Sequence, residues 1–126
     1  MSIQPGERIP EAILQYVADG VHKIDTLALF EGRKFVLFSV PGAFTPTCSE
    51  RHLPGFVEHF EQFRERGIEV ACMAVNDPFV MQAWGESQHV PAGMRMLADG
   101  NADFTRALGL EMEGLENWVY EYQKVL

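Results

Sequence analysis

The feature that most constrains the fold is a pair of apolar runs, KFVLFSV at residues 34–40 and IEVACMAV at residues 68–75. Both runs are rich in β-branched and aromatic residues, and apolar side chains fall on both faces of each predicted strand. Strands that are buried on both faces lie inside a sheet that helices cover on each side. The two runs therefore predict an α/β domain with a mainly parallel central sheet.

The segments around these runs supply the other elements of such a domain. Residues 12–24 are two apolar runs separated by Asp19-Gly20, a pair that is typical of a hairpin turn. Apolar residues between Leu53 and Phe63 recur at spacings of three and four, which predicts an amphipathic helix ended by Gly67. Pro54 falls in or just after its first turn, where a proline can kink a helix.

Two further helices and one strand are predicted in the second half of the chain. Asp77-Pro78 is a helix cap followed by a proline at the first helical position, so a helix is expected over residues 79–87. Its apolar side is expected to be Phe79, Val80, Ala83 and Trp84. A short strand at residues 94–98, a helix at 102–108 and a strand-like composition at 118–122 complete the pattern.

Composition excludes several classes of function. A length of 126 residues predicts one domain spanning residues 1–126, and the net charge of −8 disfavours nucleic-acid binding. No apolar stretch is long enough to span a membrane, so no membrane partner is expected. The two cysteines, Cys48 and Cys72, have no metal-like spacing and are too few for a secreted disulfide scaffold. We therefore expect a reducing compartment, the cytoplasm, and no metal.

Cys48 lies in SVPGAFTPTCSERHLPGF, residues 39–56, between a buried strand and a helix. A free cysteine is often only a small buried hydrophobe, and this alternative applies to Cys48 as well. Three features favour a reactive thiol. The unpaired N–H groups at a helix start favour the thiolate, the hydroxyl of Thr45 lies three residues earlier, and Pro41, Pro46 and Pro54 stiffen the loop. Cys72 lies mid-strand among apolar residues and is expected to be structural filler.

The pattern Pro41-x-x-x-Thr45-x-x-Cys48 is similar to the active-site signature of peroxiredoxins, which are thiol peroxidases of the thioredoxin fold. The wider string PGAFTPTCS-x-x-HLPGF, together with VNDPFVMQAW and LADGNADFT, resembles the type II, glutaredoxin-linked branch. The similarity runs from about Gly6 to Met112. It implies a thioredoxin-like three-layer α/β domain with a central mixed sheet, in which the C-terminal hairpin and helix are missing or replaced.

The resemblance implies a role for each matching residue. Cys48 corresponds to the peroxidatic cysteine, which reduces hydrogen peroxide and alkyl hydroperoxides and becomes a sulfenic acid. Thr45 is expected to hold the peroxide and Pro41 to shield the sulfur, while the N–H groups of Thr47 and Cys48 bind peroxide oxygens. His52 is expected beside the pocket, either as a wall or capping residue or as a proton shuttle.

Two aromatic residues are assigned through the same resemblance. Phe44 and Phe79 are expected on an apolar rim that also makes a dimer contact in this branch, and Phe44 is counted as a substrate-binding residue. For Phe79 the alternative is simple burial in the core. After position 112 the family's edge hairpin has no match, unless residues 118–126 replace one strand, and an uncovered sheet edge can pair with another chain. The apolar rim and this edge together predict a homodimer or higher oligomer.

The resemblance also bears on turnover. Family members carry an active-site arginine after the matched blocks, and no arginine follows Arg106 in this sequence. A donor of this kind is often worth about 10²–10³ in rate. We expect a one-cysteine enzyme without a cofactor that needs glutathione, glutaredoxin or thioredoxin as external reductant. The alternative is a catalytically weakened redox-sensing or binding protein. A thioredoxin-type reductase is disfavoured because no C-x-x-C pair occurs.

Overall fold

The first elements form a hairpin followed by a short helix. A computed structural model describes residues 3–40, 42–44, 53–109 and 124–125 of the chain. Strands β1 (Ile13–Val17) and β2 (Val21–Asp25) pair antiparallel. Asp19 and Gly20 in the turn have φ values of 54° and 108°, and these positive values are the ones that a tight hairpin turn requires. The predicted hairpin is confirmed.

Helix α1 (Thr26–Phe30) joins the hairpin to strand β3 (Lys34–Ser39). The Asp25 carboxylate caps the helix by accepting from the Leu27 N–H at 2.7 Å. The buried Thr26 hydroxyl accepts from the Ala12 N–H and donates to the Pro10 carbonyl. These bonds fix the helix against the start of β1, so β3 enters the sheet from a defined position.

The segment predicted as one amphipathic helix consists of two, which corrects the sequence-based expectation. Helix α2 (Leu53–Glu58) and helix α3 (Phe60–Glu65) are separated at His59, whose backbone angles are φ −99° and ψ 9°. The interruption therefore lies at His59 and not at Pro54. The chain then passes Gly67, at φ 71°, into strand β4 (Ile68–Ala74), so the predicted end of the helical region and the second buried strand are both confirmed.

Helix α4 (Pro78–Ser87) begins as predicted, with Asp77 as its cap and Pro78 in its first turn. The side that it buries matches the expectation at Trp84 but not at Phe79 or Ala83. Its buried residues are Pro78, Met81, Trp84 and Gly85, whereas Phe79 is 60% exposed. The core alternative for Phe79 is therefore wrong. Gly85 lies close to Met96 of β5: a Cβ added at this glycine would be only 3.1 Å from Met96 Cγ. Gly85 thus lets the side of α4 on which it lies, together with Met81 and Trp84, approach the sheet closely.

The remaining elements are strand β5 (Arg95–Ala98), helix α5 (Asp103–Ala107) and strand β6 (Lys124–Val125). Strand β5 and helix α5 match the expected segments, and Gly109 follows α5 at φ 74°. The strand-like segment 118–122 lies outside the described residues, and β6 falls within the range 118–126 that was expected to replace one edge strand. It pairs antiparallel with β3, Phe38 opposite Val125 and Ser39 opposite Lys124.

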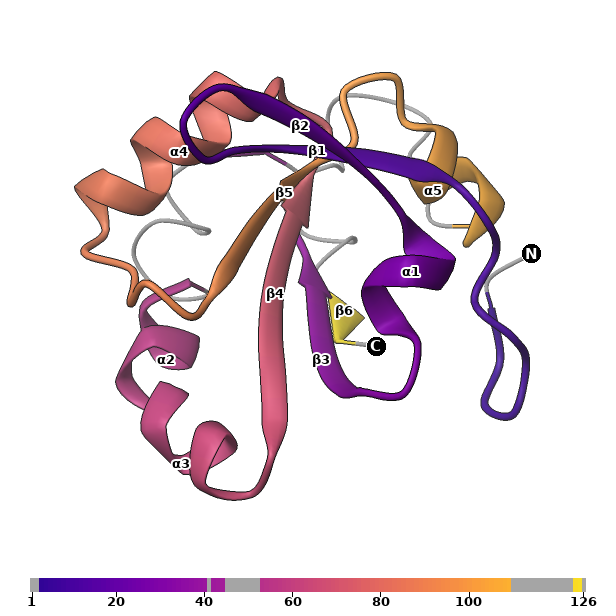
Figure 1. Ribbon diagram of the computed structural model, residues 1–126, viewed down its shortest axis with the longest axis horizontal. Coiled ribbons are helices and arrows are strands. Elements are labelled where there is room, and N and C mark those ends of the chain that lie inside the picture. Colours follow the sequence, from indigo (N-terminus) through magenta and orange to yellow (C-terminus); the bar gives the residue numbers. More distant parts are fainter. Residues whose placement is uncertain (1–2, 41, 45–52, 110–123, 126) are drawn as a thin grey trace.

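The strands form one mixed sheet in the order β2-β1-β5-β4-β3-β6. Strands β3, β4 and β5 are parallel, and β1, β2 and β6 run antiparallel to their neighbours. Figure 1 shows α2, α3 and α4 on one side of β3, β4 and β5, and α1 and α5 on the other. The expected three-layer α/β architecture with a central mixed sheet is confirmed.

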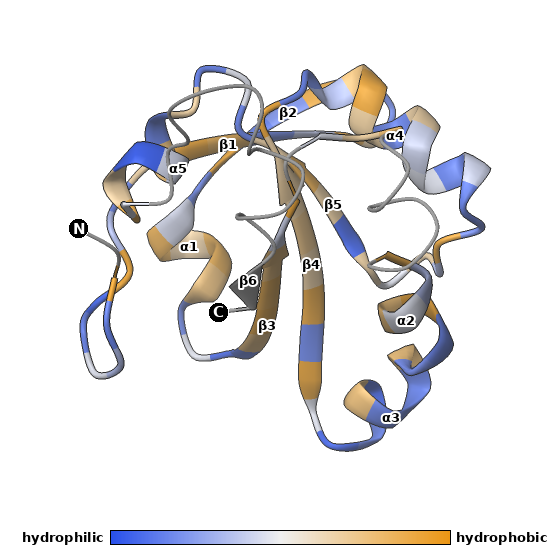
Figure 2. Cartoon of the chain, turned by 180° about the vertical axis from the view of Figure 1, so that it is seen from behind, coloured by the Kyte–Doolittle hydropathy of each residue, from blue (hydrophilic) through white to orange (hydrophobic). Residues whose placement is uncertain are grey.

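Each face of the sheet has its own core. One cluster lies under α2, α3 and α4 and includes Phe38, Val70, Cys72, Met81 and Trp84. The second lies under α1 and α5 and includes Leu14, Leu29, Leu97, Phe104 and Leu108. In Figure 2 the central strands are mostly hydrophobic in colour and α3 is mostly hydrophilic. The pattern is that of strands covered on both sides by helices that turn their polar sides outward.

Candidate functional site

The site is built where the three parallel strands end. Strands β3, β4 and β5 finish at Ser39, Ala74 and Ala98, and parallel strands bring these carboxyl ends to one edge of the sheet. The segments that follow each strand meet at this edge. In open α/β sheets ligands bind beyond the carboxyl ends of the strands, so this edge is where the candidate residues were expected.

Hydrogen bonds hold the segment after β3 at Val40 and at Ala43. The Val40 N–H donates to the Met73 carbonyl at 3.0 Å, which extends the pairing of β3 with β4. Three residues later the Ala43 N–H donates to the Asn76 side-chain Oδ1 at 2.9 Å. Phe44 follows with φ at 63°, in the left-handed region. A non-glycine residue is uncommon there and is kept by its surroundings. These contacts fix Val40 and Ala43 against the end of β4 and the residue Asn76 that follows it.

The segment after β4 leads into α4 through a side-chain cap. The Asp77 Oδ1 accepts from the Val80 N–H at 2.9 Å, and the Pro78 ring occupies the first turn, where no N–H is needed. The Asp77 carboxylate is thus engaged at the helix start.

A buried carboxylate organises the segment after β5. Asp99 is 2% exposed, and its side chain accepts from the Phe104 N–H at 3.2 Å and from the N–H and the hydroxyl of Thr105 at 2.7 Å each. Its own N–H donates to the Ala74 carbonyl at 2.9 Å. This one residue ties the end of β4 to the start of α5, and a buried carboxylate is tolerated because several donors surround it.

Three exposed apolar side chains follow the ends of β3 and β4. Phe44 is 55% exposed, Val75 is 42% exposed and Phe79 is 60% exposed. Single exposed apolar residues are common on protein surfaces, but several from adjacent segments indicate a contact region. This edge of the sheet therefore presents an apolar rim, defined here as Phe44, Val75 and Phe79, which suits an uncharged ligand or a protein partner.

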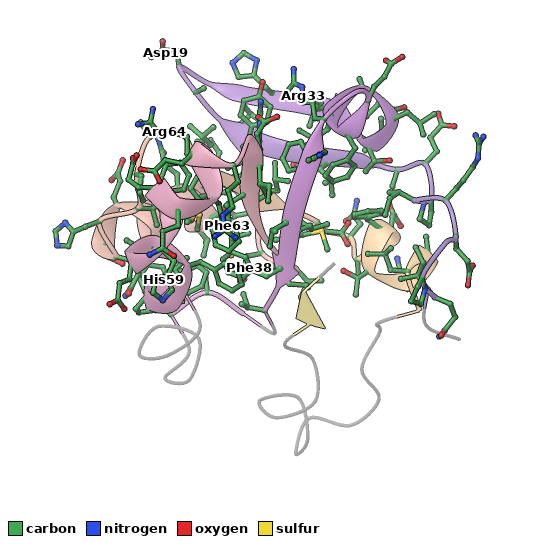
Figure 3. The ribbon with its side chains drawn as sticks, turned by 90° about the horizontal axis from the view of Figure 1, so that it is seen from below. Asp19, Arg33, Phe38, His59, Phe63 and Arg64 are labelled. Atoms are coloured by element: carbon green, nitrogen blue, oxygen red, sulfur yellow. The ribbon has the colours of Figure 1, made fainter. Side chains whose placement is uncertain are left out.

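Helix α2 is anchored by aromatic packing on the sheet. Leu53 at its start is fully buried. The Phe56 ring stacks on the Phe38 ring of β3, with centroids 4.0 Å apart and planes 5° apart, and Phe63 of α3 lies 6.1 Å from Phe56. Figure 3 shows Phe38 and Phe63 between the sheet and the helical pair. Aromatic pairs add about 0.5–1.5 kcal/mol beyond area burial, so the start of α2 is fixed against β3.

Most of the sequence-predicted site residues lie outside the described residues. This holds for Pro41, Thr45, Thr47, Cys48 and His52. Phe44 is described and lies on the apolar rim. The roles assigned to all six remain predictions.

Cys72 lies in the interior, as expected. It is fully buried in β4, opposite Phe38 of β3 and Met96 of β5, within the core under α2, α3 and α4. A sulfur without solvent-accessible surface does not meet a dissolved peroxide in the folded protein. The predicted contrast between the two cysteines therefore has structural support on the side of Cys72.

Two residues of this edge were not singled out from the sequence. Asn76 bonds to a backbone group 33 positions away, and Asp99 bonds across the turn into α5. Asn and Asp in turns usually bond locally, so their sequence context alone did not identify these longer contacts. An Asn or Asp that directly follows a buried parallel strand is the sequence signal that could have predicted these contacts.

Two searches over the described part of the chain gave negative results. Within residues 3–40, 42–44, 53–109 and 124–125, no group of three or more His, Cys, Asp or Glu side chains could hold a metal ion. Over the same residues, no helix has the length and apolar character needed to cross a membrane.

Comparisons with known proteins point in one direction. The family model described as Redoxin matches residues 4–122. A rice protein, peroxiredoxin-2E-2, chloroplastic, from Oryza sativa subsp. japonica, is 51% identical over 117 residues, which are 89% of this chain and 52% of the rice protein. Peroxiredoxin-2B of Arabidopsis thaliana is 40% identical over 114 residues, which are 88% of this chain and 70% of that protein.

A solved structure agrees with these relatives. The crystal structure of reduced Prx3 from Vibrio vulnificus in complex with H₂O₂ is matched with a TM-score of 0.86 and 46% sequence identity. The match covers 96% of this chain and 75% of that one. The expected thioredoxin-like peroxiredoxin fold is thereby confirmed. The chain spans about half the length of the rice relative.

Proposed function

Since the chain belongs to the redoxin family, and within it to the peroxiredoxins of the type II branch, we propose that it is a thiol-dependent peroxidase whose reacting group is Cys48. The observation that carries this proposal is the 51% identity to a peroxiredoxin over 89% of the chain. The strand-end geometry supports it, because the segment that carries Cys48 in the sequence leaves β3 at the edge where α/β sheets bind ligands.

The proposed reaction has a simple balance. The Cys48 thiolate attacks one oxygen of a hydroperoxide ROOH, a sulfur–oxygen bond forms and the O–O bond breaks. The sulfur is oxidised to the sulfenic acid, and the RO⁻ leaving group takes a proton and departs as ROH, which is water for hydrogen peroxide. The substrates proposed are hydrogen peroxide and small alkyl hydroperoxides, which are uncharged and match the apolar rim of Phe44, Val75 and Phe79.

Regeneration is proposed to need an external thiol. One thiol condenses with the sulfenic acid to a mixed disulfide and releases water, and a second thiol exchanges to free Cys48. Of this chain's two cysteines, Cys72 is fully buried in the middle of β4, so it would have to leave the core to resolve the sulfenic acid. This burial favours the one-cysteine type, with glutathione, glutaredoxin or thioredoxin as the donor.

The neighbouring residues are given roles in the same proposal. Thr45 orients the peroxide through its hydroxyl, and Pro41 shields the sulfur. The Thr47 N–H stabilises the negative charge that develops on the peroxide oxygen. His52 belongs to the wall of the pocket and Phe44 to its rim.

Assembly and location are proposed from exposed apolar residues and from the cysteines. The exposure of Phe44 and Phe79 supports a homodimer or higher oligomer that covers the apolar rim. Two cysteines in the sequence, one of them fully buried in the core, support a reducing compartment. The rice relative is chloroplastic by name, so we propose a reducing compartment in general and not the cytoplasm in particular.

The proposal is tested by peroxide consumption with dithiothreitol or with a glutaredoxin system as reductant. The parent protein should consume hydrogen peroxide well above the rate of free dithiothreitol, and Cys48→Ser should abolish this rate. Cys72→Ser is the matched control and should retain it, because Cys72 has no access to solvent. An undiminished rate in Cys48→Ser refutes the proposal. Rapid formation of the sulfenic acid without turnover would instead support the redox-sensing alternative.

A further inference from the structure

The Asn76 side chain bonds to the backbone of the segment that leads to Cys48. Its Oδ1 accepts from the Ala43 N–H at 2.9 Å, across 33 positions of sequence. Asn76 is half-buried and follows β4 by two residues, and Ala43 is half-buried and follows β3 by four. The bond therefore joins the segments that leave two adjacent parallel strands.

This hydrogen bond takes over where the backbone pairing of the two strands ends. Directly after β3 the Val40 N–H donates to the Met73 carbonyl, and the next carbonyl along β4, that of Ala74, accepts from the Asp99 N–H of the neighbouring segment. The Ala43 N–H would otherwise be a partly buried donor in need of a partner. The amide oxygen of Asn76 supplies that partner in place of a backbone carbonyl.

The next residue along the chain is in a conformation that needs such support. Phe44 has φ at 63° and is 55% exposed, so its own side-chain burial does little to hold it there. A left-handed non-glycine residue persists when its surroundings determine it. The hydrogen bond to Asn76 fixes the Gly42–Ala43 peptide group and therefore sets the position from which the chain enters Phe44.

The far end of the same segment is fixed independently. Leu53 is fully buried at the start of α2, and Phe56 stacks on Phe38 of β3. In sequence Cys48 lies four residues after Phe44 and five before Leu53. Among the described residues, the segment that carries Cys48 is thus attached to the sheet before and after it, by the hydrogen bond of Ala43 and by the packing of Leu53.

From this arrangement we infer that Asn76 is a positioning residue for the Cys48 reaction, acting through Ala43 and Phe44. The inference rests on the proposed function of Cys48 as the reacting thiol. Asn76 makes no contact with peroxide in this account. Its amide oxygen holds the entry of the segment, so that the thiol and the donors around it meet the substrate in a fixed geometry, and misplacement of reacting groups is costly in rate.

The test compares Asn76→Ala with Asn76→Asp in the full chain. The readout is the second-order rate of Cys48 oxidation by hydrogen peroxide, taken on the pH plateau of each variant so that changes in the thiol pKa do not enter. Asn76→Ala removes the acceptor, and we expect this rate to fall by about 10- to 100-fold. Asn76→Asp keeps an acceptor oxygen at the same position, and its rate should stay within about threefold of the parent.

Controls separate positioning from a general loss of structure. Asn101→Ala makes the same truncation on an exposed residue at the same edge of the sheet and should leave the rate unchanged. Urea unfolding of each variant shows whether the fold is retained. If Asn76→Ala does not fold, Asn76→Gln carries the test. Its acceptor lies one carbon further out, and it should lose rate while Asn76→Asp does not.

The outcomes distinguish the inference from the proposed function. If Cys48→Ser is as active as the parent, the proposed function fails and the inference fails with it. If activity depends on Cys48 but folded Asn76→Ala reacts as fast as the parent, the inference alone is overturned. Equal losses in folded Asn76→Ala and Asn76→Asp also overturn it, since the retained acceptor should restore the geometry.

Discussion

Replacement of Asp99 by alanine should destabilise the fold more than any exposed substitution at the same edge. The side chain is 2% exposed and accepts three hydrogen bonds, from the Phe104 N–H and from the N–H and hydroxyl of Thr105. Phe104 and Thr105 are themselves buried, so Asp99→Ala leaves donors without partners away from water. Such donors keep the desolvation cost that the carboxylate had offset.

The magnitude follows from these contacts. A hydrogen bond to a charged group contributes about 1.5–3 kcal/mol, so three of them at the lower figure amount to about 4–5 kcal/mol. Domains of this size are stable by about 5–15 kcal/mol, so Asp99→Ala should remain only marginally folded. Asp99→Asn keeps an acceptor oxygen for the N–H and hydroxyl of Thr105 but turns an amide NH2 toward the Phe104 N–H, and we expect it to lose about 1.5–3 kcal/mol.

Urea unfolding followed by circular dichroism measures the effect. With an m value of about 1–3 kcal/mol per molar urea, the midpoint of Asp99→Ala should fall by at least about 1.5 M. Asp103→Ala is the matched control. Its carboxylate forms only an exposed pair with Arg106 at 3.0 Å, which is worth less than about 1 kcal/mol. If the free energy of unfolding of Asp99→Ala is within about 1 kcal/mol of that of the parent, the hydrogen bonds of Asp99 do not stabilise the contact between β4, β5 and α5 as described.

Three glycine and alanine exchanges should change stability in opposite directions, each read as a shift in the urea midpoint. Gly93→Ala places a Cβ 2.9 Å from Cζ of the buried Phe60, and the forced repacking should cost about 1–3 kcal/mol; an unchanged midpoint would contradict this. Gly55→Ala, inside α2 with open space around it, should gain about 0.5–1 kcal/mol, and a loss would argue against the helix there. Ala102→Gly removes the cost of a left-handed alanine at φ 60° and should gain about 0.5–1 kcal/mol after the added chain entropy. A clear loss would show that the position is not left-handed in solution.

Elements set by local chemistry could be predicted from the sequence. Asp19-Gly20 specifies the hairpin because both residues tolerate positive φ. Asp77-Pro78 specifies the start of α4 because one caps an N–H and the other needs none. The alternation of buried strands with helices indicated the layers and a mainly parallel sheet, and the mixed character of the sheet was implied by the family resemblance.

Features set by tertiary contact could not be predicted in the same way. Apolar residues occur all around α4, so periodicity did not identify its buried side. The deciding residue, Gly85, is small and carries no hydrophobic signal, yet it allows close approach to Met96. The interruption at His59 also carries no sequence mark. In the candidate site, the bond from Ala43 to Asn76 spans 33 positions, so it becomes visible only when the parallel strands are placed side by side.

The central claim is that the two cysteines differ in chemistry because one lies beyond a strand end and the other is fully buried within a strand. The most direct test adds a stoichiometric amount of hydrogen peroxide to the reduced protein in the presence of a sulfenic-acid probe and locates the label by mass spectrometry. The account predicts rapid labelling of Cys48, none of Cys72, and loss of labelling in Cys48→Ser. Labelling of Cys72, or oxidation of Cys48 no faster than that of a free thiol, would contradict it.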